Sequence, residues 1–90
     1  MNEEKVLPEK KFKAGAINVT IWKNERQKES GEEFSYYSIS IDRRYKNKNG
    51  EWQSTNSLRV NDLPKAILVL NKAYEYLVLK EQETTEEVVL

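Results

Sequence analysis

Residues 34–52 read FSYYSISIDRRYKNKNGEW, and this stretch decides the fold. From Phe34 to Tyr45 apolar and polar residues alternate, which predicts a strand with one buried side. Tyr37, Ile39 and Ile41 point one way, and the residues between them point the other way: Tyr36, Ser38, Ser40, Asp42 and Arg44. Asn49-Gly50 is the strongest short signal for a hairpin, because both residues tolerate positive φ. The chain then returns as a strand from Trp52.

Upstream of this hairpin, residues 17–22 alternate in the same way and predict another strand, with a bend near Gly15. The polar segment 23–33 predicts a connecting loop. Downstream, Leu58–Val60 is expected to form a short further strand. Asn61 or Asp62 then caps a helix over residues 66–80, which contain neither Gly nor Pro. The fold class is therefore α+β: a twisted antiparallel sheet of about four strands followed by one long amphipathic helix.

The expected helix is more apolar than one small sheet requires. One stripe repeats at spacings of 3, 4 and 7 and is expected to cover the sheet: Leu63, Ala66, Ile67, Leu70, Tyr74, Leu77 and Val78. A second apolar group falls outside that stripe: Leu68, Val69, Tyr76 and Leu79. Isolated surface apolar residues are common, but this second group predicts the interface of a homodimer.

The two ends of the chain differ from its middle. Residues 1–11 are polar and contain Pro8, so we expect a flexible arm. Residues 12–80 form the ββββα domain, and the acidic residues 81–90 are expected to form a disordered tail that can dock a protein partner. Between residues 10 and 59 there are eleven Lys and Arg against six Asp and Glu, whereas both ends are acidic. This asymmetry is typical of a nucleic-acid surface, although a mixed solvated surface explains it equally well.

The composition excludes several classes of function. The chain has no Cys and no His, which rules out disulfides, thiolate metal sites and catalysis by Ser–His–Asp or Cys–His groups. We expect no enzyme activity, no cofactor and no metal. No apolar run is long enough to span a membrane, and the polar start is unlike a signal peptide. The expected location is cytoplasmic, and nucleoid-associated in a prokaryote.

The side of the sheet turned away from the helix is expected to carry the binding site. It combines aromatic rings, small hydrogen-bonding groups and cations, which is what single-stranded nucleic acid needs for stacking and phosphate contact. The candidate contacts are Lys13, Asn18, Thr20, Trp22, Tyr36, Ser38, Arg43, Arg44, Tyr45, Lys46, Trp52 and Arg59. Trp22 and Tyr36 are equally consistent with a cross-strand aromatic pair that only stabilises the sheet.

The run from Ile39 to Trp52, followed by Leu58-Arg59-Val60 and an Asn-capped helix containing Pro64, resembles the core of the positive-cofactor-four transcriptional coactivators. The Whirly and Pur-alpha groups use the same ββββα plan. The resemblance implies a dimer joined through its helices, with sheets that grip single-stranded DNA. It also implies that Tyr45 supplies an aromatic contact, Gly50 the hairpin glycine and Asn61 the helix cap. Asp42 departs from the family pattern, because a basic residue is usual there.

These features predict a homodimeric protein that binds single-stranded nucleic acid, with DNA preferred, largely without regard to sequence. Its role would lie in transcription or in replication and repair. The alternative is a protein–protein adaptor that uses the helix faces and the acidic tail. The two differ in one cheap observation, since only the first binds oligonucleotides with an affinity that falls as salt rises.

Overall fold

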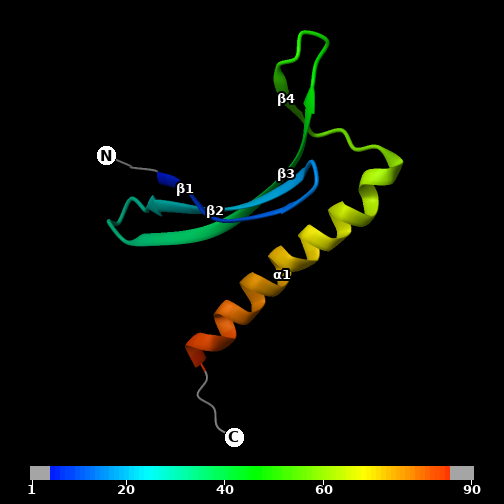
Figure 1. Ribbon diagram of the computed structural model, residues 1–90. Helices are drawn as coiled ribbons and strands as arrows, with labels where there is room; N and C mark the ends of the chain where they lie inside the picture. The colour runs from blue at the N-terminus through cyan, green and yellow to red at the C-terminus, as the bar shows by residue number, and fades with distance from the viewer. Residues whose placement is uncertain (1–4, 86–90) are drawn as a thin grey trace, which may run out of the picture.

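The computed structural model describes residues 5–85 and shows a four-stranded antiparallel sheet followed by one helix (Figure 1). The strands are β1 (Lys5–Ala14), β2 (Ile17–Gln27), β3 (Glu33–Lys46) and β4 (Trp52–Thr55), and they are neighbours in chain order. A 3-10 turn, η1 (Val60–Asp62), leads into α1 (Leu63–Thr85). The predicted ββββα architecture is confirmed. In the described part of the chain, no helix is both long and apolar enough to cross a membrane.

Each hairpin turns where the sequence supplies a residue that accepts positive φ. Gly50 has φ of 79° at the end of the β3–β4 turn, as the Asn-Gly signal predicts. The Asn47 side-chain oxygen accepts hydrogen bonds from the backbone N–H groups of Asn49 and Glu51, both at 2.9 Å. These two hydrogen bonds stabilise the turn around the Asn47 side chain. The predicted bend at Gly15 is also present, with φ of 61° between β1 and β2.

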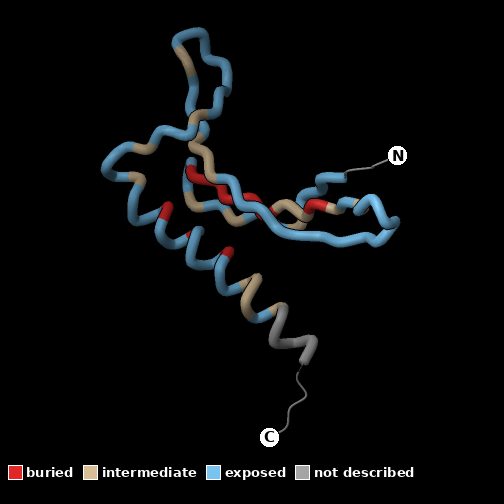
Figure 2. The backbone as a smooth tube through the Cα atoms, turned by 180° about the vertical axis from the view of Figure 1, so that it is seen from behind, coloured by how far each residue is buried: buried red, intermediate tan, exposed pale blue. Residues whose placement is uncertain are grey.

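The core lies between β2 and α1 (Figure 2). Ile17, Val19 and Ile21, which alternate along β2, are completely buried. The helix presents Ala66, Val69 and Ala73 to them, and all three are also buried. Two alanines in this seam let the helix backbone approach the sheet closely, so the three branched side chains of β2 fill the space between the two layers.

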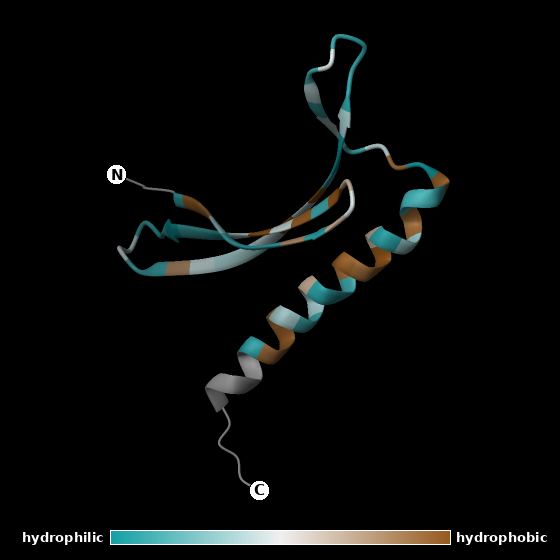
Figure 3. Ribbon diagram, viewed as in Figure 1, coloured by the Kyte–Doolittle hydropathy of each residue, from teal (hydrophilic) through white to brown (hydrophobic). Residues whose placement is uncertain are grey.

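The helix is rotated from the orientation that the periodicity predicts. Val69 is buried and Tyr76 is partly buried against the core, so the prediction of these two residues at a dimer interface is wrong. Leu68 and Leu79 are exposed, as that prediction requires. Part of the stripe expected to cover the sheet is exposed instead, and we call it the apolar flank: Leu63, Ile67, Leu70 and Tyr74. Figure 3 shows hydrophobic segments along much of the helix, not only beside the sheet.

The rotation has a cause in β1, which the sequence does not reveal as a full strand. The ring of Tyr76 meets that of Phe12 of β1 edge-on, with centroids 6.2 Å apart. The Tyr76 hydroxyl also donates to the Glu9 carboxylate at 3.0 Å. Because β1 extends the sheet beyond β2 on this side, the helix turns toward it and leaves the flank uncovered.

Three predicted boundaries are wrong. Residues 5–11, expected to be a flexible arm, belong to β1, where backbone pairing with β2 holds them. Leu58–Val60 is not a strand, because the chain turns there into η1. The helix continues through residues 81–85, which were expected to be part of the tail, while residues 1–4 and 86–90 lie outside the described part of the chain. The fourth strand of the sheet is thus β1 and not the segment before the helix.

The start of the helix is fixed to the sheet through Asp62. Its carboxylate accepts a hydrogen bond from the Arg59 backbone N–H at 2.8 Å, so Asp62 is the third residue of a capping box whose N-cap is Arg59, and not the N-cap predicted for Asn61 or Asp62. The same oxygen lies 3.3 Å from Nε of Arg43 on β3. Arg43 Nε also donates to the Ser57 carbonyl at 3.1 Å. The β4–α1 connection is therefore tied to β3 by one partly buried guanidinium.

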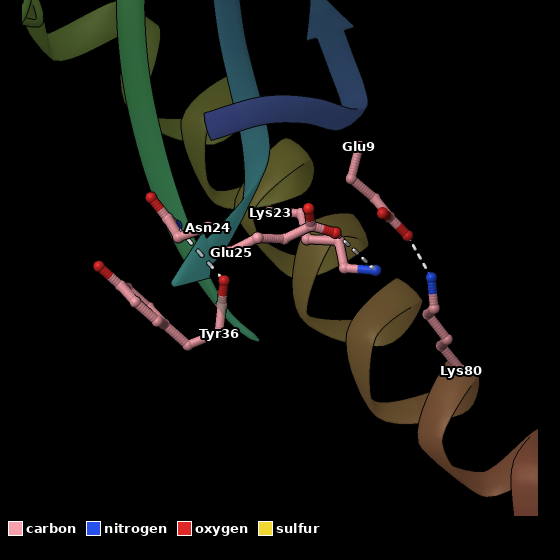
Figure 4. A network of polar contacts seen from close by, with 6 residues as sticks. All are labelled: Glu9, Lys23, Asn24, Glu25, Tyr36 and Lys80. Atoms are coloured by element: carbon pink, nitrogen blue, oxygen red, sulfur yellow. Dashed lines mark hydrogen bonds and ion pairs between the residues drawn. The ribbon is translucent and has the colours of Figure 1, made fainter. Parts of the chain in front are cut away.

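The other end of the helix is held by Glu9, at an irregularity in β1 between Pro8 and Lys10. Glu9 forms an ion pair with Lys80 (Figure 4). It also accepts a hydrogen bond from the Tyr76 hydroxyl. The hydrogen bond from Lys80, followed by that from Tyr76, holds the pKa of Glu9 below its usual 4.5. The same contact with Glu9 raises the pKa of Lys80 and that of Tyr76. The carboxylate is therefore favoured in the folded state.

Replacing Glu9 with glutamine is expected to lower the thermal midpoint slightly at pH 7. A carboxylate with a depressed pKa stabilises the fold above its unfolded pKa, and this contribution is lost as pH falls through the folded value. The difference between wild type and Glu9→Gln should therefore shrink below pH 4.5 and disappear well below it. Thermal unfolding at pH 7 and pH 3 measures this, with Glu29→Gln in the β2–β3 loop as the control. A difference as large at pH 3 as at pH 7 would contradict the assignment.

Candidate nucleic-acid interface

The strand register places alternate residues of the sheet on the side away from α1, which we call the open face. In β2 and β3 the directly paired residues on this face are Asn18 with Asp42, Thr20 with Ser40, Trp22 with Ser38, and Asn24 with Tyr36. Lys11 and Lys13 of β1 lie opposite Thr20 and Asn18 and join the same face. Figure 1 shows the β3–β4 hairpin bending away from α1, so the open face lies on the inside of the bend.

The floor of the open face is a network of side-chain hydrogen bonds. The Trp22 indole N–H donates to the Ser40 hydroxyl at 2.9 Å. The Asn24 amide donates to the Ser38 hydroxyl at 3.0 Å and to the Tyr36 carbonyl at 3.3 Å (Figure 4). These bonds fix the rotamers of residues that would otherwise be mobile on an uncovered sheet.

Two of the predicted contacts are too deep to reach a ligand. Asn18 and Thr20 are 7% and 4% exposed, because they lie on β2, which has a paired strand on each side. Their role is to support the surface. Ser38 is exposed and stays a candidate hydrogen-bonding group.

One end of the open face carries an aromatic pair. The rings of Phe34 and Tyr36 are stacked, with centroids 6.4 Å apart and an interplanar angle of 20°. Both are about 40% exposed. The guanidinium of Arg26 lies 6.0 Å from the Tyr36 ring centroid. Trp22 lies opposite Ser38, not opposite Tyr36, so these two predicted contacts are not a directly opposed pair.

The other end of the open face carries Trp52, which is 59% exposed. Lys46 is paired with it across the β3–β4 hairpin, and Lys46 Nζ lies 5.5 Å from the Trp52 ring centroid. The Arg44 guanidinium lies 6.0 Å from the same ring. An exposed indole with two cations close to its ring offers a stacking surface and two phosphate partners within one group of residues.

Three predicted contacts do not share the open face. Arg43 and Tyr45 alternate with Arg44 and therefore point to the helix side of the sheet. Arg43 is held by Asp62 and Ser57, and it lies 5.6 Å from the Tyr45 ring centroid. Arg59 lies in the connection to η1 and not in a strand. Arg43 and Arg59 were expected on or near the rim of the open face, and Tyr45 at the start of the hairpin. None of the three lies on the open face, because Arg43 and Tyr45 have the other parity and Arg59 has left the sheet.

Four residues on this face were missed by sequence reasoning: Lys11, Asn24, Arg26 and Phe34. Phe34 precedes Tyr36 by two positions, so the period-2 pattern already placed it on the same side. Asn24 and Arg26 were assigned to a loop because residues 23–27 are all polar. A strand whose two faces are both polar carries no hydrophobic alternation to reveal it.

Among the side chains that the structure describes, which end at Lys80, no group of three or more acidic residues is arranged to hold a metal ion. Comparison with protein-family models, with curated proteins and with solved structures found no match to this chain. The case for a function therefore depends on the geometry of the open face.

Proposed function

We propose that this protein binds single-stranded nucleic acid on the open face of its sheet, with DNA as the first ligand to test. The observation that carries the proposal is the placement of exposed aromatic groups at both ends of one uncovered face. Phe34 and Tyr36 stand at one end and Trp52 at the other. Trp52 of β4 is paired with Lys46, which follows Tyr36 by ten residues along β3, or roughly 30 Å of extended strand.

Each class of side chain has a separate part in this binding. The rings stack on unpaired bases, which every base allows, so recognition is tolerant of sequence. Lys11, Lys13, Arg44 and Lys46 contact phosphates along the same face. Ser38 and Ser40, already oriented by Asn24 and Trp22, keep oxygen lone pairs for hydrogen bonds from the ligand.

The arrangement favours a single strand over a duplex. Stacking on a protein ring requires bases that are not already stacked on both sides, and paired bases in a duplex expose only their edges. A role in transcription or in replication and repair, and a location in the cytoplasm or nucleoid, follow from this ligand. The resemblance to the positive-cofactor-four group supports the same ligand through the order of elements that it implies.

Oligo-dT titrated into the protein is expected to quench tryptophan fluorescence, since Trp52 lies on the proposed path. If the four cations named above each contact one phosphate, the plot of log affinity against log salt should have a slope of about −3. The measurement needs only wild-type protein at several salt concentrations. An unchanged fluorescence signal at low salt would refute the proposal and favour the protein–protein adaptor.

A further inference from the structure

The sheet has one long edge that nothing covers in the described part of the chain. β4 pairs with β3 only at Arg43–Lys46, so residues 33–42 of β3 have a neighbour, β2, on one side only. The Arg44 N–H donates to the Ala16 carbonyl at 2.9 Å, which places the even-numbered backbone groups toward β2. The odd-numbered groups of Ser35, Tyr37, Ile39 and Ile41 therefore point outward. Such a row of free N–H and C=O groups is a template for another strand.

The two outer edges of the sheet differ in how they are protected. The edge of β1 carries Pro8, the irregularity at Glu9, and four lysines: Lys5, Lys10, Lys11 and Lys13. Prolines, bulges and lysines are the usual means by which proteins prevent edge strands from pairing. The free edge of β3 has none of these, since residues 34–41 contain neither a charge nor a proline. The contrast between the two edges indicates that the β3 edge pairs with another strand.

The helix side of this edge carries apolar side chains, with Lys80 Nζ 5.7 Å from the Tyr37 ring centroid. Tyr37 and Ile39 of β3 are 37% and 44% exposed there. The contacts of Tyr76 with Phe12, and of Lys65 with Gly15, place that side of α1 toward β1 and the β1–β2 turn. The apolar flank is on the other side of the helix, toward β3. An unprotected edge and an uncovered apolar surface therefore lie next to each other.

We propose that a second copy of this chain pairs with the β3 edge, antiparallel and around a two-fold axis at Ser38. In this register Tyr37 of each copy lies opposite Ile39 of the other, and Ser35 opposite Ile41. All four outward-facing residues of each copy then exchange hydrogen bonds. β4 closes both ends of the paired segment, and no like charges are opposed. Aromatic and β-branched side chains are a favourable cross-strand pair.

The exposed area suits a second copy of the chain. Taking about 200 Å² for a large apolar side chain, Tyr37, Ile39 and the four residues of the apolar flank expose about 600 Å² per copy. A stable interface buries about 800 Å² per partner, and the paired backbones supply the remainder. In the dimer both helices lie on the same side, above β2 strands about 14 Å apart, so side chains of the two flanks reach into the space between them.

The dimer joins the two open faces into one surface across eight strands, but the inference does not depend on nucleic-acid binding. Pairing at the β3 edge takes the place of the helix-only interface that was expected from Leu68, Val69, Tyr76 and Leu79. Its test uses protein alone, so its failure and the failure of the proposed function are separate results.

A single cysteine at the two-fold axis gives the sharpest test, since the chain has no cysteine of its own. Ser38 and its copy form a non-hydrogen-bonded pair with Cα atoms about 4.5 Å apart, within the range that a disulfide spans. Mild oxidation of Ser38→Cys should give a cross-linked dimer. Ser40→Cys is the matched control, on the same strand and face. Its two copies would be about 13 Å apart and should not cross-link.

Light scattering on a sizing column supplies the second measurement. Wild type and the β1-edge variant Leu7→Lys should have the mass of a dimer, and Ile39→Lys should have the mass of a monomer with an unchanged circular dichroism spectrum. Equal cross-linking of Ser38→Cys and Ser40→Cys would overturn the proposal. So would a wild type that is monomeric at about 100 µM, which is on the order of ordinary working concentrations.

Discussion

Replacing Trp52 with alanine is expected to weaken the binding of oligo-dT about 5- to 150-fold. Loss of one stacked base costs about 1–3 kcal/mol, and each 1.4 kcal/mol corresponds to a factor of ten in affinity. Trp52 is the most exposed aromatic residue of the open face, and the cationic groups of Lys46 and Arg44 lie within about 6 Å of its ring centroid. The indole therefore contributes to binding in two ways: it stacks on a base, and it positions two cations that contact phosphates. Fluorescence anisotropy of a labelled oligonucleotide measures the loss.

Tyr45→Ala is the matched control for this variant. Tyr45 is an exposed aromatic residue of the same hairpin, but it points to the helix side of the sheet. If the open face binds the ligand, Tyr45→Ala should leave the affinity nearly unchanged. A larger loss from Tyr45→Ala than from Trp52→Ala would place the ligand on the helix side of the sheet, where Tyr45 lies.

Much of the sheet could be predicted because one of its faces is buried. The alternation of Ile17, Val19 and Ile21 predicts which side of β2 is covered, and all three are fully buried. The same parity places Trp22, Tyr36 and Arg44 together on the open face. A period of two determines the face of a strand residue once the strand itself is known.

Parity also explains the errors at the site. Arg43, Arg44 and Tyr45 are adjacent in sequence, and residue type alone groups them as one basic and aromatic cluster. The pleat separates them, with Arg44 on the open face and the other two on the helix side. Arg43 then serves the fold through Asp62 and is not available to a ligand.

The strand β1 and the rotation of the helix could not be predicted, and the two failures are connected. β1 contains Pro8 and Lys10-Lys11, which lower strand propensity, and its irregularity at Glu9 shifts the alternation by one residue. Without β1, nothing in the sequence calls for Tyr76 to face the sheet. The helix stripe was therefore centred on its most hydrophobic side, whereas contacts with Phe12 and Glu9 turn it toward β1.

Val69→Asp tests this rotation, and we expect it to unfold the domain or nearly so. Val69 is 3% exposed and packs against the β2 core, so an aspartate there would be a buried charge without a partner. Such a charge costs about 3–5 kcal/mol, and a domain of this size has a total stability of roughly 5–13 kcal/mol. The thermal midpoint should fall by roughly 15–30 °C. Val69→Ala, with an expected loss of about 2 kcal/mol, keeps the effect measurable if the aspartate variant does not fold.

Leu68→Asp supplies the comparison, one residue earlier on the same helix. Leu68 is 52% exposed, so its aspartate remains in water and should change the midpoint by only a few degrees. The sequence alone predicts no difference between the two positions, because both fall outside the stripe expected to face the sheet. Urea unfolding of both variants at neutral pH distinguishes the orientations. Equal tolerance of aspartate at the two positions would mean that the helix packs through Ile67 and Tyr74, and the apolar flank would then be the core.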